Sequence, residues 1–351
     1  MKSREEFQTP LDDTAYQNEI LQYVSRTFAL TIPQLPEPLC TVVANAYLLC
    51  RIADTIEDDK SMSAEQKKKY SELFIAVVKG AETADTFAEN LFPLLSPTAT
   101  IAEHDLIANT APVIRLTHGF NERQRSALER CVKIMADGMV RYQDAETLDG
   151  VADQKDMDQY CYYVAGVVGE LLTELFCDHS PEIDAQRDEM MKLGVSFGQG
   201  LQMTNILKDI WEDHERGACW LPRDVFEKHG VDIPYKKPGK MDEGFNDALI
   251  GLLGVAHAHV HNALRYTLMI PAKEKGLRKF CLWALGMSVL TLEKIRQHPD
   301  FTDGREVKIT RRSVKITIFL TSLFVGQNWI LKGLFKFAGR RLPMAKLTLD
   351  T

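Results

Sequence analysis

The sequence predicts an all-α protein, a single domain built as a helical bundle around a central apolar cavity. Apolar residues recur at helical spacing through most of the 351 residues, whereas the alternation typical of β-strands is scarce. No low-complexity linker divides the chain, and a hydrophobic content of 45% is ample for one large core. These observations favour long helices that pack on one another.

Charge and cysteine content restrict the possible functions. The formal net charge of −7 argues against nucleic acid as a partner. The seven cysteines lie mostly in apolar runs and form no C-x-x-C pair, so we expect reduced core thiols in a cytoplasmic protein. The opening residues MKSREEFQTPLDD carry acids early and lack an apolar run, which predicts neither a secretory signal nor a transit peptide.

The first helix is predicted over residues 14–31, and it stops before Pro33 because proline blocks helix continuation. It carries Ser25, Arg26 and Thr27. A guanidinium group between two hydroxyl groups suits phosphate oxygens. Taken alone, Arg26 would also fit an ordinary surface position.

An apolar helix is then predicted to lead into a D-x-x-E-D motif formed by Asp54, Glu57 and Asp58. Tyr47 and Arg51 precede Asp54 by spacings that place all three side chains on one helical face. We therefore expect Tyr47 and Arg51 to line the same site as the acidic motif.

The segment Tyr160–Phe176 is apolar on nearly every side, which predicts a central helix. Gly166 and Gly169 lie within it, although glycine in a helix interior costs up to about 1 kcal/mol relative to alanine. Close approach of another helix or of a substrate chain would explain this cost. Tyr160 and Tyr163 share one side, where a tyrosine hydroxyl group would face an apolar cavity.

A second D-x-x-E-D motif, Asp209, Glu212 and Asp213, occurs about 150 residues after the first, in a segment predicted to be one helix over Gly198–Arg216. Such stacked carboxylates repel one another. Alone, the cluster would be typical of a solvated acidic face. Two acidic helices that face each other across a bundle instead indicate a cage of oxygen atoms for Mg²⁺ and a substrate diphosphate.

Two later segments carry groups with ligand-binding chemistry. His257, His259 and His261 lie in a helix predicted over residues 246–270. No glutamate completes an H-E-x-x-H pattern, so surface histidines are expected rather than a zinc site. The basic run Lys308–Arg312 is predicted to be a mobile loop that meets a phosphorylated ligand, or else an ordinary solvated charge run.

Residues 316–335 form the most hydrophobic stretch and are predicted to be one terminal helix. Gln327, Asn328 and Lys332 interrupt it, so its apolar part falls short of the roughly 20 residues that span a bilayer. Because basic residues follow along one edge, the helix is expected either to cap the core or to lie at a membrane surface.

Four segments together resemble the squalene/phytoene synthase family, the head-to-head prenyl synthases of the isoprenoid synthase fold. They are, in order, SRTFAL, YLLCRIADTIEDD, YCYYVAGVVGELL and LQMTNILKDIWED, and the resemblance covers roughly residues 18–325. It leans toward the squalene-forming members, because the third segment is rich in tyrosine and VKITRR resembles their basic loop near NADPH. Ala284-Leu285 in place of a Pro-Gln pair, and Lys208 in place of the common arginine, depart from that pattern.

The resemblance implies a role for each candidate site residue. The candidate metal ligands are Asp54, Glu57, Asp58, Asn205, Asp209, Glu212 and Asp213. The candidate diphosphate-binding residues are Ser25, Arg26, Thr27, Arg51, Gln202, Asn205 and Lys208. The candidate catalytic residues are Tyr160, Tyr47 and Arg51. The candidate NADPH-binding residues are Lys308, Arg311 and Arg312.

The implied activity is the Mg²⁺-dependent joining of two molecules of farnesyl diphosphate through presqualene diphosphate, followed by NADPH-dependent reduction to squalene. One alternative is a non-reducing member that makes dehydrosqualene, phytoene or presqualene diphosphate, and a more distant one is a non-catalytic helical scaffold. We expect residues 1–15 to be a tail, residues 16–313 the catalytic domain, and residues 314–351 a hydrophobic and basic C-terminal helix and tail. The expected location is the cytoplasm, with peripheral contact at the cytoplasmic face of a membrane through the C-terminal helix.

Overall fold

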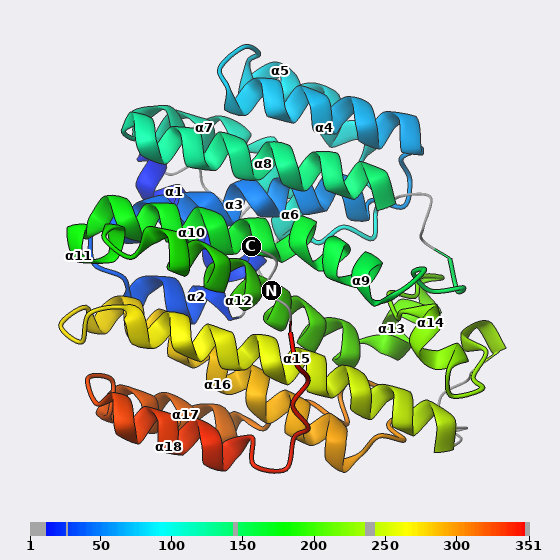
Figure 1. Cartoon of the computed structure of the whole chain (residues 1–351). Coiled ribbons are helices and arrows are strands. Elements are labelled where there is room, and N and C mark those ends of the chain that lie inside the picture. The colour runs from blue at the N-terminus through cyan, green and yellow to red at the C-terminus, as the bar shows by residue number, and fades with distance from the viewer. Residues whose placement is uncertain (1–11, 26, 143–146, 236–242, 348–351) are drawn as a thin grey trace. The chain divides into compact units, whose positions relative to one another are not determined.

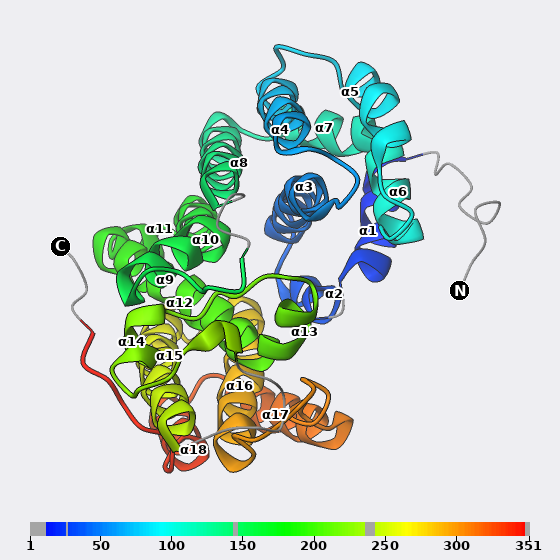
Figure 2. The same ribbon diagram turned by 90° about the vertical axis from the view of Figure 1, so that its right-hand side faces the viewer.

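Helices make up all the regular secondary structure that is described. The structure is a computed structural model that describes residues 12–25, 27–142, 147–235 and 243–347. No β-strand forms in these ranges (Figures 1 and 2). An isolated bridge pairs Val151 with Pro222. The predicted all-α class is confirmed.

The chain packs as two compact units, unit 1 with residues 1–143 and 174–181, and unit 2 with residues 144–173 and 182–351. Two helices contribute residues to both units: residues 167–173 of α10 belong to unit 2 and the remainder to unit 1, and α11 is divided after Pro181. The predicted division into a tail, a catalytic domain and a C-terminal segment stays a prediction.

Unit 1 is organised around helix α3. Its elements are α1 (Asp13–Val24), α2 (Phe28–Thr31), η2 (Ile32–Gln34), α3 (Leu39–Asp58), α4 (Ala64–Val78), α5 (Ala84–Leu91), η3 (Phe92–Leu94), α6 (Ile101–Ala108), α7 (Thr110–Gly119) and α8 (Glu122–Tyr142). Helix α3 packs against α1, α4, α6, α7 and α8. Leu48, Leu49 and Ile52 on α3 are completely buried, which places this helix in the core of the unit.

Helix α3 is also the one helix in the described ranges that is long and apolar enough to cross a membrane. However, 67% of its apolar window is buried within the protein. The helix also ends in the acidic residues Asp54, Glu57 and Asp58. Both features fit a core helix.

Unit 2 is organised around helix α12. Its elements are α9 (Gln154–Cys161), the π-helical segment η5 (Tyr162–Gly166), α10 (Val167–His179), α11 (Pro181–Asp184), α12 (Arg187–Lys208), α13 (Ile210–Glu215), α14 (Arg223–Glu227), η6 (Ile233–Tyr235), α15 (Glu243–Met269), α16 (Lys275–Gln297), α17 (Arg311–Leu323) and α18 (Asn328–Ala338). Helix α12 packs against α15, α16, η5 and α9. The second acidic motif begins where α12 ends.

Direct backbone contact between α12 and the η5–α10 segment explains the glycines of the central helix. A Cβ on Gly169 would lie 1.9 Å from the carbonyl oxygen of Gly194, and a Cβ on Gly198 would lie 2.0 Å from that of Ala165. Alanine at either position would force the two helices apart. The close approach predicted from the sequence is confirmed, and the partner is another helix. These contacts anchor the helix that carries the second acidic motif.

Two predicted helices are interrupted. The helix predicted over residues 14–31 divides into α1 and α2, because Ser25 has an extended backbone and its hydroxyl accepts a hydrogen bond of 3.0 Å from the Phe28 amide. The helix predicted over Gly198–Arg216 divides at Asp209, which follows α12 and precedes α13. Helical periodicity continues through both breaks, so it does not reveal them.

The prediction of one terminal helix over residues 316–335 is wrong. These residues belong to two helices, α17 and α18, which a short turn separates. The basic run predicted as a loop is only partly a loop, because Arg311 and Arg312 form the first turn of α17. Thr310 caps this turn, and its hydroxyl accepts a hydrogen bond of 3.1 Å from the Ser313 amide.

The surface position expected for the histidines of α15 is wrong for His259. Its side chain is buried, and its Nδ1 lies 2.8 Å from the Ser196 hydroxyl, to which Asn262 donates a second hydrogen bond. Burial lowers the pKa of His259 to about 4, so the ring is neutral at neutral pH. His257 is half-buried and His261 is exposed.

The cysteines agree with the expectation of reduced thiols. All seven are free, five of them buried and two, Cys40 and Cys50, half-buried. They therefore contribute to packing rather than to cross-links.

Candidate functional site

In unit 1, the residues next to Ser25 lie against the middle of α3. The Tyr47 hydroxyl donates a hydrogen bond of 2.9 Å to the Val24 carbonyl, and the Tyr47 and Phe28 ring centroids are 5.3 Å apart. Tyr47 therefore contacts residues on both sides of the predicted phosphate-binding segment. The structure brings this segment and α3 together.

The three residues of that segment differ in their surroundings. Ser25 is buried, and its hydroxyl already accepts the hydrogen bond that starts α2. Thr27 is half-buried at the N-cap position of α2. Arg26 lies outside the described residues, so its role in diphosphate binding stays a prediction.

Arg51 is the cation of this part of the site. Its Nη2 donates to the Tyr47 hydroxyl at 3.3 Å, and its Nη1 lies 3.7 Å from a carboxylate oxygen of Glu103. Burial alone would lower the pKa of Arg51, but the Asp54 carboxylate raises it overall. The buried Nε has no hydrogen-bond partner in the described part of the chain. Leaving such a donor unpaired costs about 1–3 kcal/mol, and an anionic ligand would supply the missing acceptor.

Asp54 lies one turn before Asp58 on the same face of α3. The pKa of Asp54 is raised to about 7 overall, chiefly by burial, while Arg51 lowers it and Asp58 and Glu103 raise it. Asp58 is exposed and Glu57 is half-buried. Because a bound cation favours the ionised form of crowded carboxylates, this donor set fits Mg²⁺, which typically takes one or two carboxylates together with substrate oxygens.

The next acid, Asp59, has a structural role. Its buried carboxylate accepts hydrogen bonds from the backbone amides of Ser61, Met62 and Ser96, at 2.8, 3.2 and 2.6 Å. These bonds involve both carboxylate oxygens. Asp59 therefore fixes the turn after α3 instead of facing a ligand.

In unit 2, the second acidic motif straddles the junction between α12 and α13. Lys208 ends α12, and its Nζ lies 2.7 Å from Oδ2 of Asp209. The Asn205 carbonyl accepts a hydrogen bond of 2.8 Å from the Asp209 amide. The Asn205 side chain is exposed, and Gln202 is half-buried. The junction thus gathers a carboxylate, an ammonium group and two side-chain amides on neighbouring turns.

Asp213 is paired with a residue close in sequence. The residue is only 7% exposed, and its carboxylate forms an ion pair with Arg216. Burial raises the pKa of Asp213, while the hydrogen bond from Arg216 lowers it. Asp209, which is half-buried, is the more accessible aspartate of the motif.

Glu212 connects the second acidic motif to the loop that contains Gly304, a contact that the sequence did not predict. Its Oε1 accepts a hydrogen bond of 2.8 Å from the Gly304 amide, and its Oε2 is buried without a partner in the described residues. The neighbouring Trp211 donates to the Phe301 carbonyl at 2.7 Å. A Cβ on Gly304 would lie 2.8 Å from the Lys208 carbonyl oxygen, so this close approach requires glycine. In the sequence, the segment from Pro299 to Gly304 breaks the helical pattern before the basic run, but it does not indicate a contact with Glu212.

Tyr160 stacks on Trp220, with ring centroids 3.9 Å apart and an angle of 6° between the planes. Trp220 is buried, so it fixes the half-buried tyrosine ring from one side. The π-helical segment Tyr162–Gly166 follows, and such wide turns occur frequently at functional sites. The sequence indicated Trp220 only as a residue that follows the second motif.

The predicted NADPH-binding residues Lys308, Arg311 and Arg312 are exposed. They follow the loop that Glu212 holds through Gly304. No acidic residue occurs in the sequence between Glu306 and Asp350 to neutralise them locally. Their donor chemistry fits the phosphate groups of NADPH.

The two acidic motifs belong to different units, the first to unit 1 and the second to unit 2. Among the described residues, no group of three or more His, Cys, Asp or Glu side chains is arranged to hold a metal ion. The Mg²⁺ site expected from both motifs together stays a prediction.

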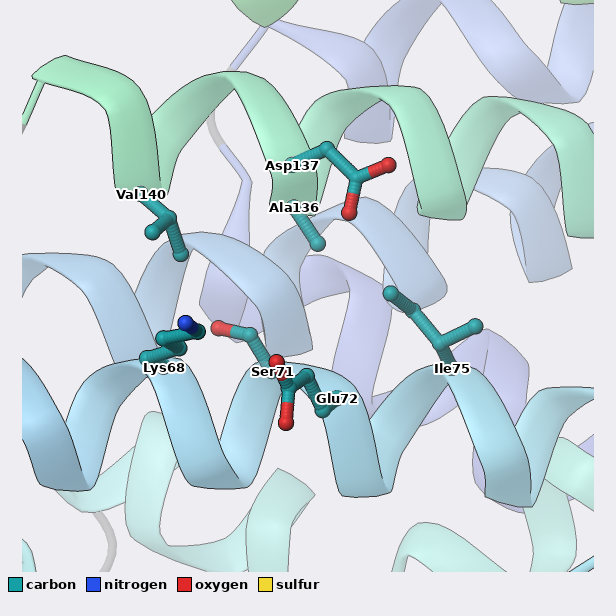
Figure 3. Close-up of a pocket in the computed structure, with 7 residues that line it drawn as sticks. All are labelled: Lys68, Ser71, Glu72, Ile75, Ala136, Asp137 and Val140. Carbon is teal, nitrogen blue, oxygen red and sulfur yellow. The ribbon is translucent and has the colours of Figure 1, made fainter.

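A cavity in unit 1 lies between α4 and α8 (Figure 3). Its volume is about 110 Å³, whereas ligand pockets usually enclose roughly 300 Å³ or more. No predicted site residue lines it. The lining residues are Lys68, Ser71, Glu72, Ile75, Ala136, Asp137 and Val140. This cavity is therefore not a candidate substrate site.

The sequence profile of the squalene/phytoene synthase family matches residues 21–313, which is most of the chain. The chain belongs to the squalene/phytoene synthase family. A squalene synthase of Gibberella zeae, ERG9, is 30% identical to this family member over 300 residues, covering 83% of the chain and 60% of the relative. Squalene synthase clz20 of Cochliobolus lunatus is 28% identical over 296 residues, covering 84% and 68%. The chain thus spans about 60–68% of the length of these curated relatives.

A solved structure supports the fold of this family member. The ligand complex of TcSQS with BPH1237 is similar with a TM-score of 0.74 and 24% identity, covering 95% of this chain and 94% of that chain. At 24% identity, this structural similarity supports the fold and nothing further. The isoprenoid synthase fold expected from the four sequence segments is confirmed.

Proposed function

We propose that this family member joins two molecules of farnesyl diphosphate head to head in the presence of Mg²⁺ and reduces the product, presqualene diphosphate, with NADPH to squalene. Its family, the names of its relatives and its two acidic motifs support the proposal. In the first step two allylic diphosphates yield one cyclopropyl-containing diphosphate, one inorganic diphosphate and one proton. In the second, hydride from NADPH replaces the remaining diphosphate.

The observation that carries the proposal is the pairing of Arg51 with the first acidic motif on one helix. The buried Nε of Arg51 lacks an acceptor in the described residues, and burial holds the pKa of Asp54 at about 7. A diphosphate that carries a divalent cation supplies both an acceptor for Arg51 and a positive charge for Asp54. A helix end with only a structural role needs neither.

The site residues would have different roles, which follow from the chemistry of their side chains. Asp54 in unit 1 and Asp209 in unit 2 would each ligate Mg²⁺, which when bound offsets the charge of the leaving diphosphate. Arg51 and Lys208 would bind and orient diphosphate oxygens. Tyr160, held by its stacking partner, would present its ring or hydroxyl group to the carbocation and direct proton loss.

The basic residues after the second acidic motif would take part in the reduction of presqualene diphosphate. Lys308, Arg311 and Arg312 would bind the phosphate groups of NADPH, which when bound supplies the hydride. The hydrogen bond between Glu212 and Gly304 would hold the loop that precedes them.

Diphosphate release from farnesyl diphosphate tests the proposal. We expect Asp54→Asn and Asp209→Asn each to lower the rate of release by at least about a hundredfold, because a metal ligand stabilises charge in the transition state. Asp137→Asn is the matched control, since Asp137 is an exposed acid on α8 that pairs with Lys133. Full turnover by either motif variant would contradict the metal assignment. The absence of any Mg²⁺-dependent release by the unmodified protein would favour the helical scaffold.

A further inference from the structure

The guanidinium group of Arg51 is held at two of its nitrogen atoms before any ligand binds. Its Nη2 donates to the Tyr47 hydroxyl at 3.3 Å, and this hydroxyl is itself tied to the Val24 carbonyl at the end of α1. Its Nη1 lies 3.7 Å from Oε1 of Glu103, a residue of α6. Contacts with α1 and α6 therefore give the Arg51 side chain a definite orientation.

Glu103 is in turn fixed by the start of α6. Thr100 is the N-cap residue of this helix, and its amide and hydroxyl groups donate to Oε2 of Glu103 at 2.8 and 2.9 Å. The Thr100 hydroxyl accepts a hydrogen bond of 3.2 Å from the Glu103 amide. This reciprocal arrangement is a capping box. It engages Oε2 of Glu103, while Oε1 is the oxygen that faces Arg51.

The ion pair between Arg51 and Glu103 is largely shielded from water. The two side chains are 27% and 22% exposed, and their helices, α3 and α6, pack directly on each other. Partly buried charges are screened by salt much less than charges at an open surface. The attraction of Glu103 can therefore help to orient the guanidinium group.

Glu103 faces the opposite end of the guanidinium group from the edge that binds two oxygen atoms. In Arg115, Nε and Nη2 form this edge and donate to the two carboxylate oxygens of Asp13 at 2.9 and 2.6 Å. In Arg51 the same edge contains the buried Nε, which has no partner in the described part of the chain. Its Nη2 has a second N–H group besides the one that Tyr47 accepts. This edge suits two oxygen atoms of a phosphate group.

The charge of Glu103 also acts on the neighbouring acidic motif. Burial has the largest effect on the pKa of both Arg51 and Asp54, lowering the first and raising the second, and the Glu103 carboxylate raises both. A carboxylate at this place would repel a bound diphosphate directly. Repulsion of the ligand and orientation of Arg51 therefore predict opposite effects when the charge is removed.

We propose that Glu103 is a positioning residue for diphosphate binding. Through Nη1 it holds Arg51 so that the edge formed by Nε and Nη2 faces the diphosphate, and it contacts neither the substrate nor the metal ion. A side chain that is ordered in advance loses less freedom when the ligand arrives, so orientation of Arg51 strengthens binding. The inference rests on the proposed function, in which Arg51 binds diphosphate oxygens.

Replacement of Glu103 by glutamine separates its charge from its place in the capping box. Glutamine also completes a capping box, so Glu103→Gln keeps the start of α6 and removes the charge that faces Arg51. We expect the Kd for inorganic diphosphate with Mg²⁺, measured by titration calorimetry, to rise by about three- to tenfold. The KM for farnesyl diphosphate should rise in parallel, with a smaller change in kcat. Relief of repulsion alone would lower both constants.

Replacement of Thr100 tests the same contact while the charge is kept. Thr100→Ala removes a hydroxyl group that holds Glu103, so the Kd for diphosphate should rise by at least about twofold. Thr100→Ser keeps the hydroxyl group and should restore the Kd of the unmodified protein. The matched control is Thr83→Ala, which removes the N-cap hydroxyl of α5 in the same unit. It should lower stability in urea as Thr100→Ala does, yet leave the Kd unchanged.

The inference is overturned if the unmodified protein binds diphosphate and Glu103→Gln leaves the Kd unchanged or lowers it. It is also overturned if Thr100→Ala and Thr83→Ala change the Kd equally, because the effect would then follow from lost stability. In both cases the proposed reaction stands as long as the unmodified protein releases diphosphate from farnesyl diphosphate. If the unmodified protein neither binds nor releases diphosphate, the proposed function fails and this inference fails with it.

Discussion

The Glu212 carboxylate accepts a hydrogen bond of 2.8 Å from the Gly304 backbone amide. This contact joins the second acidic motif to the loop that leads into the basic run, and Trp211 binds the same loop through the Phe301 carbonyl. A residue that the resemblance offers as a metal ligand thus also positions a loop. In the proposed enzyme, the diphosphate site and the NADPH-binding residues would be coupled through this contact.

We expect Gly304→Ala to impair reduction more than condensation. The added Cβ would lie 2.7 Å from Oε1 of Glu212 and 2.8 Å from the Lys208 carbonyl oxygen, so the loop must move away from the motif. The ratio of squalene to presqualene diphosphate, measured by mass spectrometry, should fall by about tenfold or more, since small displacements of reacting groups are costly.

Two controls separate this effect from general damage. Gly251→Ala on α15 places its Cβ in open space and should leave the ratio unchanged. Glu212→Gln keeps an acceptor oxygen for Gly304, so its ratio of squalene to presqualene diphosphate should stay close to that of the unmodified protein, although the loss of a candidate metal ligand lowers its total turnover. A normal product ratio in Gly304→Ala would show that the loop contact has no role in reduction.

Asp54→Asn should stabilise the metal-free protein while it abolishes turnover. The pKa of Asp54 in the folded state is raised to about 7, so ionisation of this carboxylate lowers stability progressively as the pH rises from the unfolded value near 4 through 7. Asparagine does not ionise. Near pH 8 we expect the free energy of unfolding to rise by about 1–3 kcal/mol, measured by urea unfolding with a chelator present.

The matched comparison for this stability measurement is Asp137→Asn, which should change stability little because Asp137 is exposed. A lower stability of Asp54→Asn near pH 8 would mean that the attraction between Asp54 and Arg51 outweighs the cost of burying the carboxylate.

Gly198→Ala should destabilise unit 2. Its Cβ would lie 2.0 Å from the Ala165 carbonyl oxygen, and a backbone atom cannot yield as a flexible side chain does. We expect a loss of at least about 1–3 kcal/mol in urea unfolding. Gly251→Ala, exposed on a helix, should instead be neutral or gain up to about 1 kcal/mol. Equal behaviour of the two variants would contradict the close packing of α12 on the η5–α10 segment.

His259 should make the protein sensitive to acid. Burial lowers its pKa to about 4, below the ordinary value of 6.5, so the stability that the neutral ring contributes is complete above pH 6.5 and is lost as the pH falls toward 4. The loss can reach about 3 kcal/mol. His259→Gln should flatten this part of the stability profile. His261→Gln, an exposed change on the same helix, should leave the profile as it is, and an identical profile for both variants would contradict the burial of His259.

The spacing of residues in the sequence was sufficient to predict a contact where both residues lie on one face of the same helix. Tyr47 and Arg51 share a face as predicted, and their side chains are hydrogen-bonded. The glycine at 169 also pointed correctly to a close approach. The first prediction depends on helical periodicity and the second on the absence of a side chain, and both can be recognised in a single sequence.

Contacts between distant segments and the local ends of helices were not predictable in this way. The stacking of Trp220 on Tyr160 and the bond from Gly304 to Glu212 depend on how helices pack, not on spacing. The break at Ser25 depends on one side-chain hydrogen bond that leaves the helical period intact. Asp59 directly follows the first acidic motif in the sequence, and only its three backbone donors reveal a structural role.

Product analysis by mass spectrometry tests the central claim most directly. The purified protein is incubated with farnesyl diphosphate and Mg²⁺, with and without NADPH. We expect presqualene diphosphate without NADPH and squalene only with it. Dehydrosqualene or presqualene diphosphate as the final product regardless of NADPH would contradict the reductive step and assign the chain to the non-reducing members, and no product at all would contradict the proposed activity.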